Sequence, residues 1–215
     1  MKDFCRVYSA DVAPLEDEAL FRDYFTRVPS WRQERIDAIR HPEGKRLSLG
    51  VSVLLTRALA SAGIDALSER FAVSEKEKPF LPGHPEIFFS LSHAGTKALC
   101  AVSGFPVGCD VEAVGRGTPR LAARYYAPDE QALLTAETDP DRWHSLFTGI
   151  WTKKESYLKA TGDGLSRPLN SFSVISPPEG CRFFDLAAPE GFRYSCCLLG
   201  DAAELPRPEQ FSVSL

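Results

Sequence analysis

The feature that most constrains the fold is a long amphipathic segment that runs from Pro140 to about Ala160. Its apolar residues recur at helical spacing, which predicts a helix with one buried stripe. Asp139 can cap the start of this helix, Pro140 suits its first turn, and Gly162 provides a stop. The stripe consists of Trp143, Leu146, Phe147, Ile150, Trp151 and Leu158. Because this face is rich in aromatic side chains, the helix must pack inward against the rest of the chain.

A second long helix is predicted over residues 45–62, which Gly63 ends. Shorter helices are predicted over residues 15–25, over residues 30–39 with Ser30 as a possible cap, after Thr118, and from Asp129 to Leu134. Alternating or continuous apolar runs predict strands at residues 4–9, 71–73, 87–91, 99–102, 107–112, 172–175, 181–185, 192–198 and 211–213. Two halves emerge, each with a long helix that leads into strands.

Composition limits the function classes. A chain of 215 residues that is 44% hydrophobic can build a real core, and a net charge of −4 gives no general case for nucleic-acid binding. The start of the chain does not resemble a signal peptide, and no apolar run reaches membrane-spanning length. The six cysteines contain no C-x-x-C pair and mostly sit in apolar runs, and the four histidines lack the spacing of zinc ligands. We therefore expect a reduced, cytoplasmic protein with buried thiols, no membrane partner and no nucleic-acid partner.

Two carboxylates share one side of a predicted strand. Asp110 and Glu112 alternate with Cys109 and Val111, and a strand has a period of two, so both acids point the same way. Two adjacent carboxylates repel each other unless a cation lies between them or one holds a proton. Taken alone, the pair is also compatible with an exposed polar strand face.

A charged pair lies near the end of the long helix. Glu155 follows Trp151 by one turn and therefore flanks the buried stripe, and Lys159 lies one turn further on the same face. An ordinary surface ion pair between Glu155 and Lys159 would look the same.

Read together, these stretches resemble the Sfp type of 4′-phosphopantetheinyl transferase. The resemblance covers roughly residues 30–175, and the landmarks occur in the family's order. They are Lys78-Pro79, Ser92-His93, the G-x-D-x-E strand Gly108–Glu112, the W-x-x-K-E-x-x-x-K helix Trp151–Lys159, Gly164-Leu165 and Phe172–Val174. Any one of these motifs is weak, whereas the ordered set is specific.

The resemblance implies an α+β fold of two similar lobes related by a pseudo-twofold axis. Each lobe would be a long helix packed on a small antiparallel sheet, with the site between them. A boundary near Phe105 divides the chain into residues 1–105, which would hold the nucleotide end of coenzyme A, and residues 106–215, which would carry the metal-binding carboxylates. The nucleotide-binding part and the metal-binding part of the site both lie on one chain, so a monomer is expected.

The resemblance also implies an enzyme that transfers the 4′-phosphopantetheine arm of coenzyme A to a serine of an apo acyl or peptidyl carrier protein and releases 3′,5′-ADP. It assigns Asp110, Glu112 and Glu155 to Mg²⁺, with Mn²⁺ as an alternative metal. Glu155 would also act as the general base, and Lys159 would hold a phosphate. Oxygen ligands of this kind suit such a metal.

The remaining residues that the resemblance implicates would hold coenzyme A. Basic residues would contact its phosphates, a Lys-Pro pair would line the adenine, and a Ser-His pair would hold the 3′-phosphate end. These are Arg32, Arg35, Arg46, Lys78, Pro79, Ser92 and His93. The chain departs from the family at Glu77, where glycine is common. Glu130 matches a family acid, although it could equally be an ordinary acid at a helix start.

Two alternatives remain at this point. The chain could be a non-catalytic module that binds coenzyme A or a carrier protein, although the presence of all three carboxylates argues against that reading. It could also be a Mg²⁺-dependent phosphodiester hydrolase that uses the same three acids.

Overall fold

The computed structural model describes residues 3–76 and 78–215, without the side chain of Leu165. Its helices are α1 (Glu18–Phe25), α2 (Ser30–Asp37), α3 (Pro42–Ser61), α4 (Pro119–Tyr125), α5 (Pro128–Ala136) and α6 (Pro140–Thr161), with short 3₁₀ turns η1 (Ala13–Glu16), η2 (Gly164–Ser166) and η3 (Leu169–Ser171). Its strands are β1 (Cys5–Asp11), β2 (Ala72–Val73), β3 (Pro79–Phe80), β4 (Phe88–Ala94), β5 (Lys97–Ser103), β6 (Val107–Ala113), β7 (Cys181–Leu186), β8 (Phe192–Leu199) and β9 (Glu209–Val213). The departure from the family at Glu77 lies outside the described residues.

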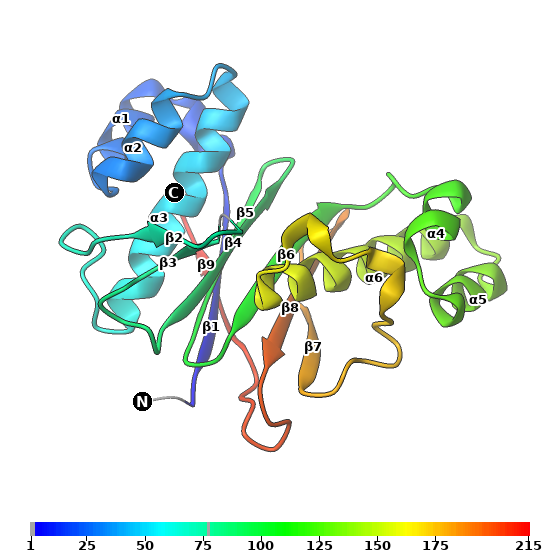
Figure 1. The fold of residues 1–215 in the computed structure, drawn as a ribbon. Helices are drawn as coiled ribbons and strands as arrows, with labels where there is room; N and C mark the ends of the chain where they lie inside the picture. Colours follow the sequence, from blue (N-terminus) through cyan, green and yellow to red (C-terminus); the bar gives the residue numbers. More distant parts are fainter. Residues whose placement is uncertain (1–2, 77) are drawn as a thin grey trace.

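The first sheet has the strand order β4-β5-β1-β9, and α3 packs on it. Its strand pairs are antiparallel except β1 and β9, which run parallel. Strand β5 is buried on both faces: Cys100 and Val102 belong to the core under α3, whereas Leu99 and Ala101 face the second sheet. In Figure 1, α1 to α3 lie on the left of this sheet and α4 to α6 on the right.

The second sheet has the order β6-β8-β7, and α6 covers its outer face. Gly108 makes this close approach possible, because a Cβ atom there would lie 1.8 Å from the carbonyl oxygen of Ser156. The aromatic stripe in the first half of α6 packs against α4 and α5 around Tyr126 and Phe147. Both the glycine and the aromatic stripe therefore fix the position of α6 over β6.

The predicted α+β fold class is confirmed, with one long helix packed on each small sheet. Asp139 caps α6 by accepting from the backbone N–H of Arg142, and Gly162 ends it in the left-handed conformation. The first sheet differs from the expectation in its one parallel pair, because the chain end returns as β9 beside β1. The division at residues 105 and 106 stays a prediction. None of the helices among the described residues has the length and apolar character needed to cross a membrane.

Three local predictions were wrong or shifted. Residues 172–175 form no strand, because the N–H of Val174 donates to the carboxylate of Glu130 (2.7 Å) instead of pairing in a sheet. The helix predicted from Leu15 begins at Glu18, since Asp17 caps it by accepting from the backbone N–H of Leu20. Ser30 lies inside α2 and is not its cap.

Candidate active site

A cavity of about 620 Å³ opens between the two lobes. Its walls come from α2, α3, β3, β4, β6 and the second half of α6. The cavity brings together nine of the eleven residues that the sequence implicated: Arg32, Arg35, Pro79, Ser92, His93, Asp110, Glu112, Glu155 and Lys159. The remaining two, Lys78 and Arg46, are not among the residues that line it.

Two elements place the charged groups at this cavity. On β6, Gly108 lies under α6, and the alternation of the strand then turns Asp110 and Glu112 toward the same helix. On α6, Glu155 and Lys159 are one turn apart and flank the buried stripe. The close packing of α6 on β6 therefore brings the acid pair of the strand to the Glu–Lys pair of the helix.

Asp110 is the buried centre of the site, and its two oxygens differ. Oδ1 accepts hydrogen bonds from Lys159 Nζ (2.6 Å) and Ser92 Oγ (2.7 Å). Oδ2 is buried and has no hydrogen-bond partner among the residues that the structure describes. The backbone N–H of Val111 donates to Ser92 Oγ (3.3 Å), so Ser92 also joins strand β4 to strand β6. A buried carboxylate oxygen without a partner is costly and would gain from a further cation or donor.

The other two carboxylates, Glu112 and Glu155, both have a raised pKa and therefore bind a proton more readily than an ordinary glutamate. Burial, followed by the negative charge of Asp110, raises the pKa of Glu112 above its ordinary value. The same two causes raise the pKa of Glu155, and Lys159 only partly offsets them. A cation between these acids would remove their mutual repulsion.

The donor set fits an oxygen-bound cation, although the carboxylates are not gathered around one point. Among residues 3–76 and 78–215, no three His, Cys, Asp or Glu side chains form a group that could hold a metal ion as they stand. The ammonium of Lys159 instead takes one oxygen of Asp110. Three carboxylates on one cavity, one of them with an unpartnered oxygen, are ligands that Mg²⁺ prefers.

Cationic side chains line the opposite wall. Arg32 is buried and held by α3: its Nε donates to Ser52 Oγ (2.7 Å), and its Nη2 donates to the carbonyl of Ser48 (3.0 Å). Within the part of the chain that the structure describes, no carboxylate lies within ion-pair distance of it. Burial, together with the nearby charge of Arg35, lowers the pKa of Arg32 to about 10. The side chain is thus a preformed anion ligand.

His93 stands at the rim between the two charged walls. Partial desolvation, followed by the positive charges of Lys159 and Arg32, lowers its pKa below the ordinary 6.5. The imidazole is therefore mostly neutral at pH 7 when no anion lies beside it. An anion placed beside it would favour the protonated form.

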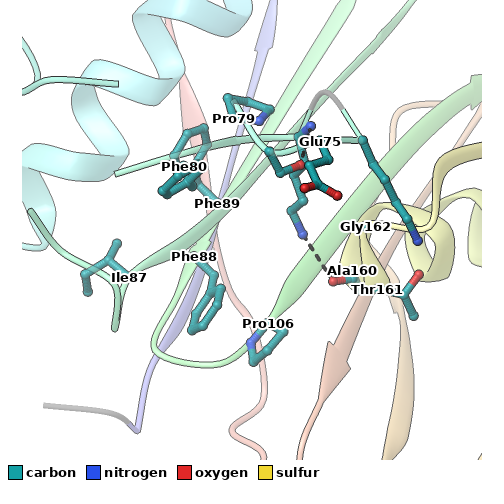
Figure 2. Close-up of a pocket in the computed structure, with 13 residues that line it drawn as sticks. Glu75, Pro79, Phe80, Ile87, Phe88, Phe89, Pro106, Ala160, Thr161 and Gly162 are labelled. Carbon is teal, nitrogen blue, oxygen red and sulfur yellow. Dashed lines mark hydrogen bonds between the residues drawn. The ribbon is translucent and has the colours of Figure 1, made fainter. Parts of the chain in front are cut away.

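Lys78 points away from this cavity. Its Nζ donates to backbone carbonyls at the end of α6, including that of Ala160 (3.1 Å), which is the dashed line in Figure 2. Burial lowers the pKa of Lys78 to about 8. The ammonium thus satisfies carbonyls that the helix end leaves free and ties the start of β3 to the end of α6.

Arg46 lies in a separate hollow near α1. Its guanidinium is 3.3 Å from the carboxylate of Glu16, and the hollow is lined by residues of η1, α1, α2 and α3. The structure does not bring Arg46 together with the other predicted ligands of coenzyme A.

Glu130 lies in a buried network of one ion pair and several hydrogen bonds, which indicates a structural role. It is fully buried, its Oε2 lies 2.8 Å from the Nζ of the fully buried Lys154, and it also accepts from the backbone N–H groups of Ala127 (2.7 Å) and Val174 (2.7 Å). Lys154 Nζ in turn donates to the carbonyl of Phe172 (2.7 Å). This network fixes residues 169–174 against α6.

Sequence reasoning missed three supporting residues. Ser48 and Ser52 hold Arg32, and they lie four residues apart among the apolar positions of the second predicted helix, where polar side chains are unexpected. The buried role of Lys154 was missed, although Lys154 is the first lysine of the W-x-x-K-E-x-x-x-K motif, because a lysine on a helix is usually exposed and the motif does not indicate Glu130 as its partner.

Comparison with known proteins agrees with the geometry. The family model described as the 4′-phosphopantetheinyl transferase superfamily matches residues 106–202. A 4′-phosphopantetheinyl transferase from Bacillus subtilis is 36% identical over 71% of this chain and 68% of its own length. The transferase Sfp from Bacillus subtilis strain 168 is 32% identical over 78% and 74%, and HetI from Nostoc sp. is 29% identical over 77% and 73%. This chain therefore belongs to the 4′-phosphopantetheinyl transferase superfamily.

Proposed function

We propose that this chain transfers the 4′-phosphopantetheine arm of coenzyme A to a serine of an apo carrier protein and releases 3′,5′-ADP. One observation carries the proposal: a single cavity holds three carboxylates on one wall and the cations of Arg32 and Arg35 on another. A diphosphate with a bound cation needs both kinds of wall. Family membership supports the same reaction, since the relatives are named for it.

Asp110, Glu112 and Glu155 would hold the metal, which we expect to be Mg²⁺ or Mn²⁺. Such an ion supplies charge neutralisation at the phosphates when it is bound. The unpartnered Oδ2 of Asp110 and the raised pKa of both glutamates support this assignment.

Lys159 would interact with Asp110 and, once coenzyme A is bound, also with a phosphate oxygen. In the structure it neutralises Asp110 through a contact of 2.6 Å. Near a diphosphate its ammonium would also neutralise a phosphate oxygen, which is the role that the family motif implies. Because Lys159 contacts both Asp110 and Ser92, it would link the metal-binding side of the cavity to the nucleotide side.

Arg32, Arg35 and His93 would hold the phosphates of coenzyme A. Arg32 needs no rearrangement, because Ser48 and Ser52 already fix it. Pro79 lines the same cavity and would contact the adenine. The ammonium of Lys78 is engaged by α6, so Lys78 would act by placing Pro79 rather than through its own charge.

Glu155 would serve as the general base for the serine hydroxyl of the carrier. A base works best when its pKa approaches the working pH, and burial beside Asp110 shifts Glu155 in that direction. The serine oxygen would form a bond to the β-phosphorus, the bond from that phosphorus to the leaving 3′,5′-ADP would break, and the serine proton would pass to Glu155.

Intact-mass analysis of an apo carrier protein tests the proposal. Incubation with the purified chain, coenzyme A and Mg²⁺ should add one phosphopantetheine to the carrier, whereas the Glu155→Gln variant should add little. If the wild-type chain adds no phosphopantetheine to any of several carrier proteins, the proposed function is wrong.

The residues of the cavity all come from one chain, which supports the further proposal of a monomer. We also propose the cytoplasm as the location of the protein.

A further inference from the structure

Two thiols outside the candidate active site are in contact. Cys181 on β7 and Cys197 on β8 have sulfur atoms 3.4 Å apart, and all six cysteines of the chain are free. Neither residue lines the cavity between the lobes. The proposed transfer reaction makes no use of this pair.

The register of the sheet explains the contact. Cys181 is opposite Leu199, and Cys197 is opposite Phe183, so the two cysteines are diagonal neighbours on the same face of β7 and β8. That face packs under the second half of α6, where Cys197 contacts the cluster that contains Tyr157. The pair therefore lies beneath the helix that carries Glu155 and Lys159.

The two thiols differ in access to solvent. Cys197 is fully buried, whereas Cys181 is partly exposed at the first residue of β7, directly after Gly180. The other sulfur pair, Cys5 and Cys196, is 4.0 Å apart and buried on both sides. Among the described residues, Cys181 is thus the one cysteine that an oxidant in solution reaches from the surface.

We propose that Cys181 and Cys197 form an oxidisable dithiol that closes to a disulfide when the chain meets a hydroperoxide. The exposed Cys181 reacts first: its sulfur takes an oxygen from the peroxide, which leaves a sulfenic acid and releases water or an alcohol. The sulfur of Cys197 then bonds to the sulfur of Cys181. The hydroxyl of the sulfenic acid leaves with the proton of the Cys197 thiol as a second molecule of water.

The order of these steps follows from the surroundings of each sulfur. Burial strongly raises the pKa of the Cys197 thiol, so that residue is a poor first target for an oxidant. It is already in contact with Cys181, however, and reacts within the protein once the sulfenic acid has formed. Closing the bond must shorten the sulfur–sulfur distance from 3.4 Å to about 2.0 Å, so the two side chains have to move toward each other.

Peptide mapping after treatment with hydrogen peroxide tests the inference. The wild-type chain should lose two hydrogen atoms in intact mass, yield a linked peptide pair that contains Cys181 and Cys197, and return to its original mass with dithiothreitol. Cys181→Ser should give no linked pair, and neither should Cys197→Ala. Cys100→Ser is the matched control, because Cys100 is buried and its thiol donates to the carbonyl of Ala101 (3.9 Å); this variant should form the link as the wild type does.

Three results would overturn the inference. Oxidation could stop at an oxygenated Cys181 with no link, the link could join Cys5 and Cys196, or Cys181→Ser could lose two hydrogen atoms as readily as the wild type. Circular dichroism of each variant before oxidation shows whether it is folded. If Cys181→Ser does not fold, the mapped position of the link in the wild type decides the question alone.

Discussion

Replacing Lys159 with methionine tests the centre of the site without removing a carboxylate. Methionine keeps the apolar part of the side chain and removes the ammonium that contacts Asp110 at 2.6 Å. Burial lowers the pKa of Lys159, but the charge and hydrogen bond of Asp110 outweigh that effect, and the net pKa lies above the ordinary 10.5. The pair is therefore intact at neutral pH, and its contribution is lost only as the pH rises through that raised pKa.

The cost can be estimated from burial. The Asp110 side chain is 5% exposed and that of Lys159 is 31% exposed. Breaking a fully buried pair costs about 3–5 kcal/mol, and an exposed pair is worth up to about 1 kcal/mol. We expect about 2 kcal/mol for this intermediate case, which corresponds to a fall in Tm of about 4–8 °C for a chain of this size. Without the Lys159 ammonium, repulsion among Asp110, Glu112 and Glu155 lowers the stability of the variant further.

Thermal denaturation with EDTA and with Mg²⁺ measures the effect. In EDTA, Lys159→Met should melt below the wild type, and Mg²⁺ should stabilise the variant more than the wild type, because the ion no longer competes with an ammonium for Asp110. Arg35→Met is the control, since it removes a cation from the same cavity for which no ion pair with Asp110 is seen. Equal melting of Lys159→Met and wild type in EDTA would refute the reasoning.

Three further predictions separate the roles of the other residues. Glu155→Gln and Glu112→Gln should lose most transfer activity. At pH 7 in EDTA, however, both variants should melt no lower than the wild type, because the raised pKa of each acid means that its ionised form destabilises the folded chain. This gain in stability should vanish as the pH falls below the ordinary pKa of 4.5, where the wild-type acids are protonated in both the folded and the unfolded chain. His93→Ala should weaken coenzyme A binding by roughly 1.5–3 kcal/mol in calorimetric titration and leave Mg²⁺ binding unchanged, and the loss should grow at lower pH, where more of the lowered-pKa imidazole is protonated. Lys154→Met should cost about 3–5 kcal/mol in urea denaturation because it leaves the buried carboxylate of Glu130 without its cation. Adding Glu130→Gln removes that charge and keeps one oxygen acceptor for the backbone N–H groups of Ala127 and Val174, so it should recover part of the loss; no recovery would show that packing, rather than the ion pair, dominates there.

The sequence predicted the elements that carry the site because their signals are local. The cap at Asp139, the stripe of α6 and the stop at Gly162 lie within one segment, and all three are seen in the structure. The alternation at Asp110 and Glu112 likewise requires only a strand. The family landmarks then placed the two segments in one site, and the cavity contains nine of the eleven implicated residues.

Tertiary contacts account for what the sequence did not predict. The carbonyls that hold Lys78 belong to the end of α6, some eighty residues later in the chain, and no pattern around Lys78 indicates them. The expected strand at residues 172–175 is apolar enough to be one, but Glu130 takes its N–H group. The parallel pairing of β9 with β1 depends on how the chain end returns, which hydrophobic periodicity cannot indicate.

The most direct test of the central claim follows both products of one reaction. The purified chain, coenzyme A and Mg²⁺ are incubated with an apo carrier protein, with the same carrier in which the acceptor serine is alanine, and without any carrier. The proposed transfer predicts phosphopantetheine on the serine-containing carrier together with an equal amount of 3′,5′-ADP, and no cleavage of coenzyme A in the other two mixtures. Cleavage of coenzyme A without a carrier, or an unmodified carrier in all three mixtures, would contradict the account.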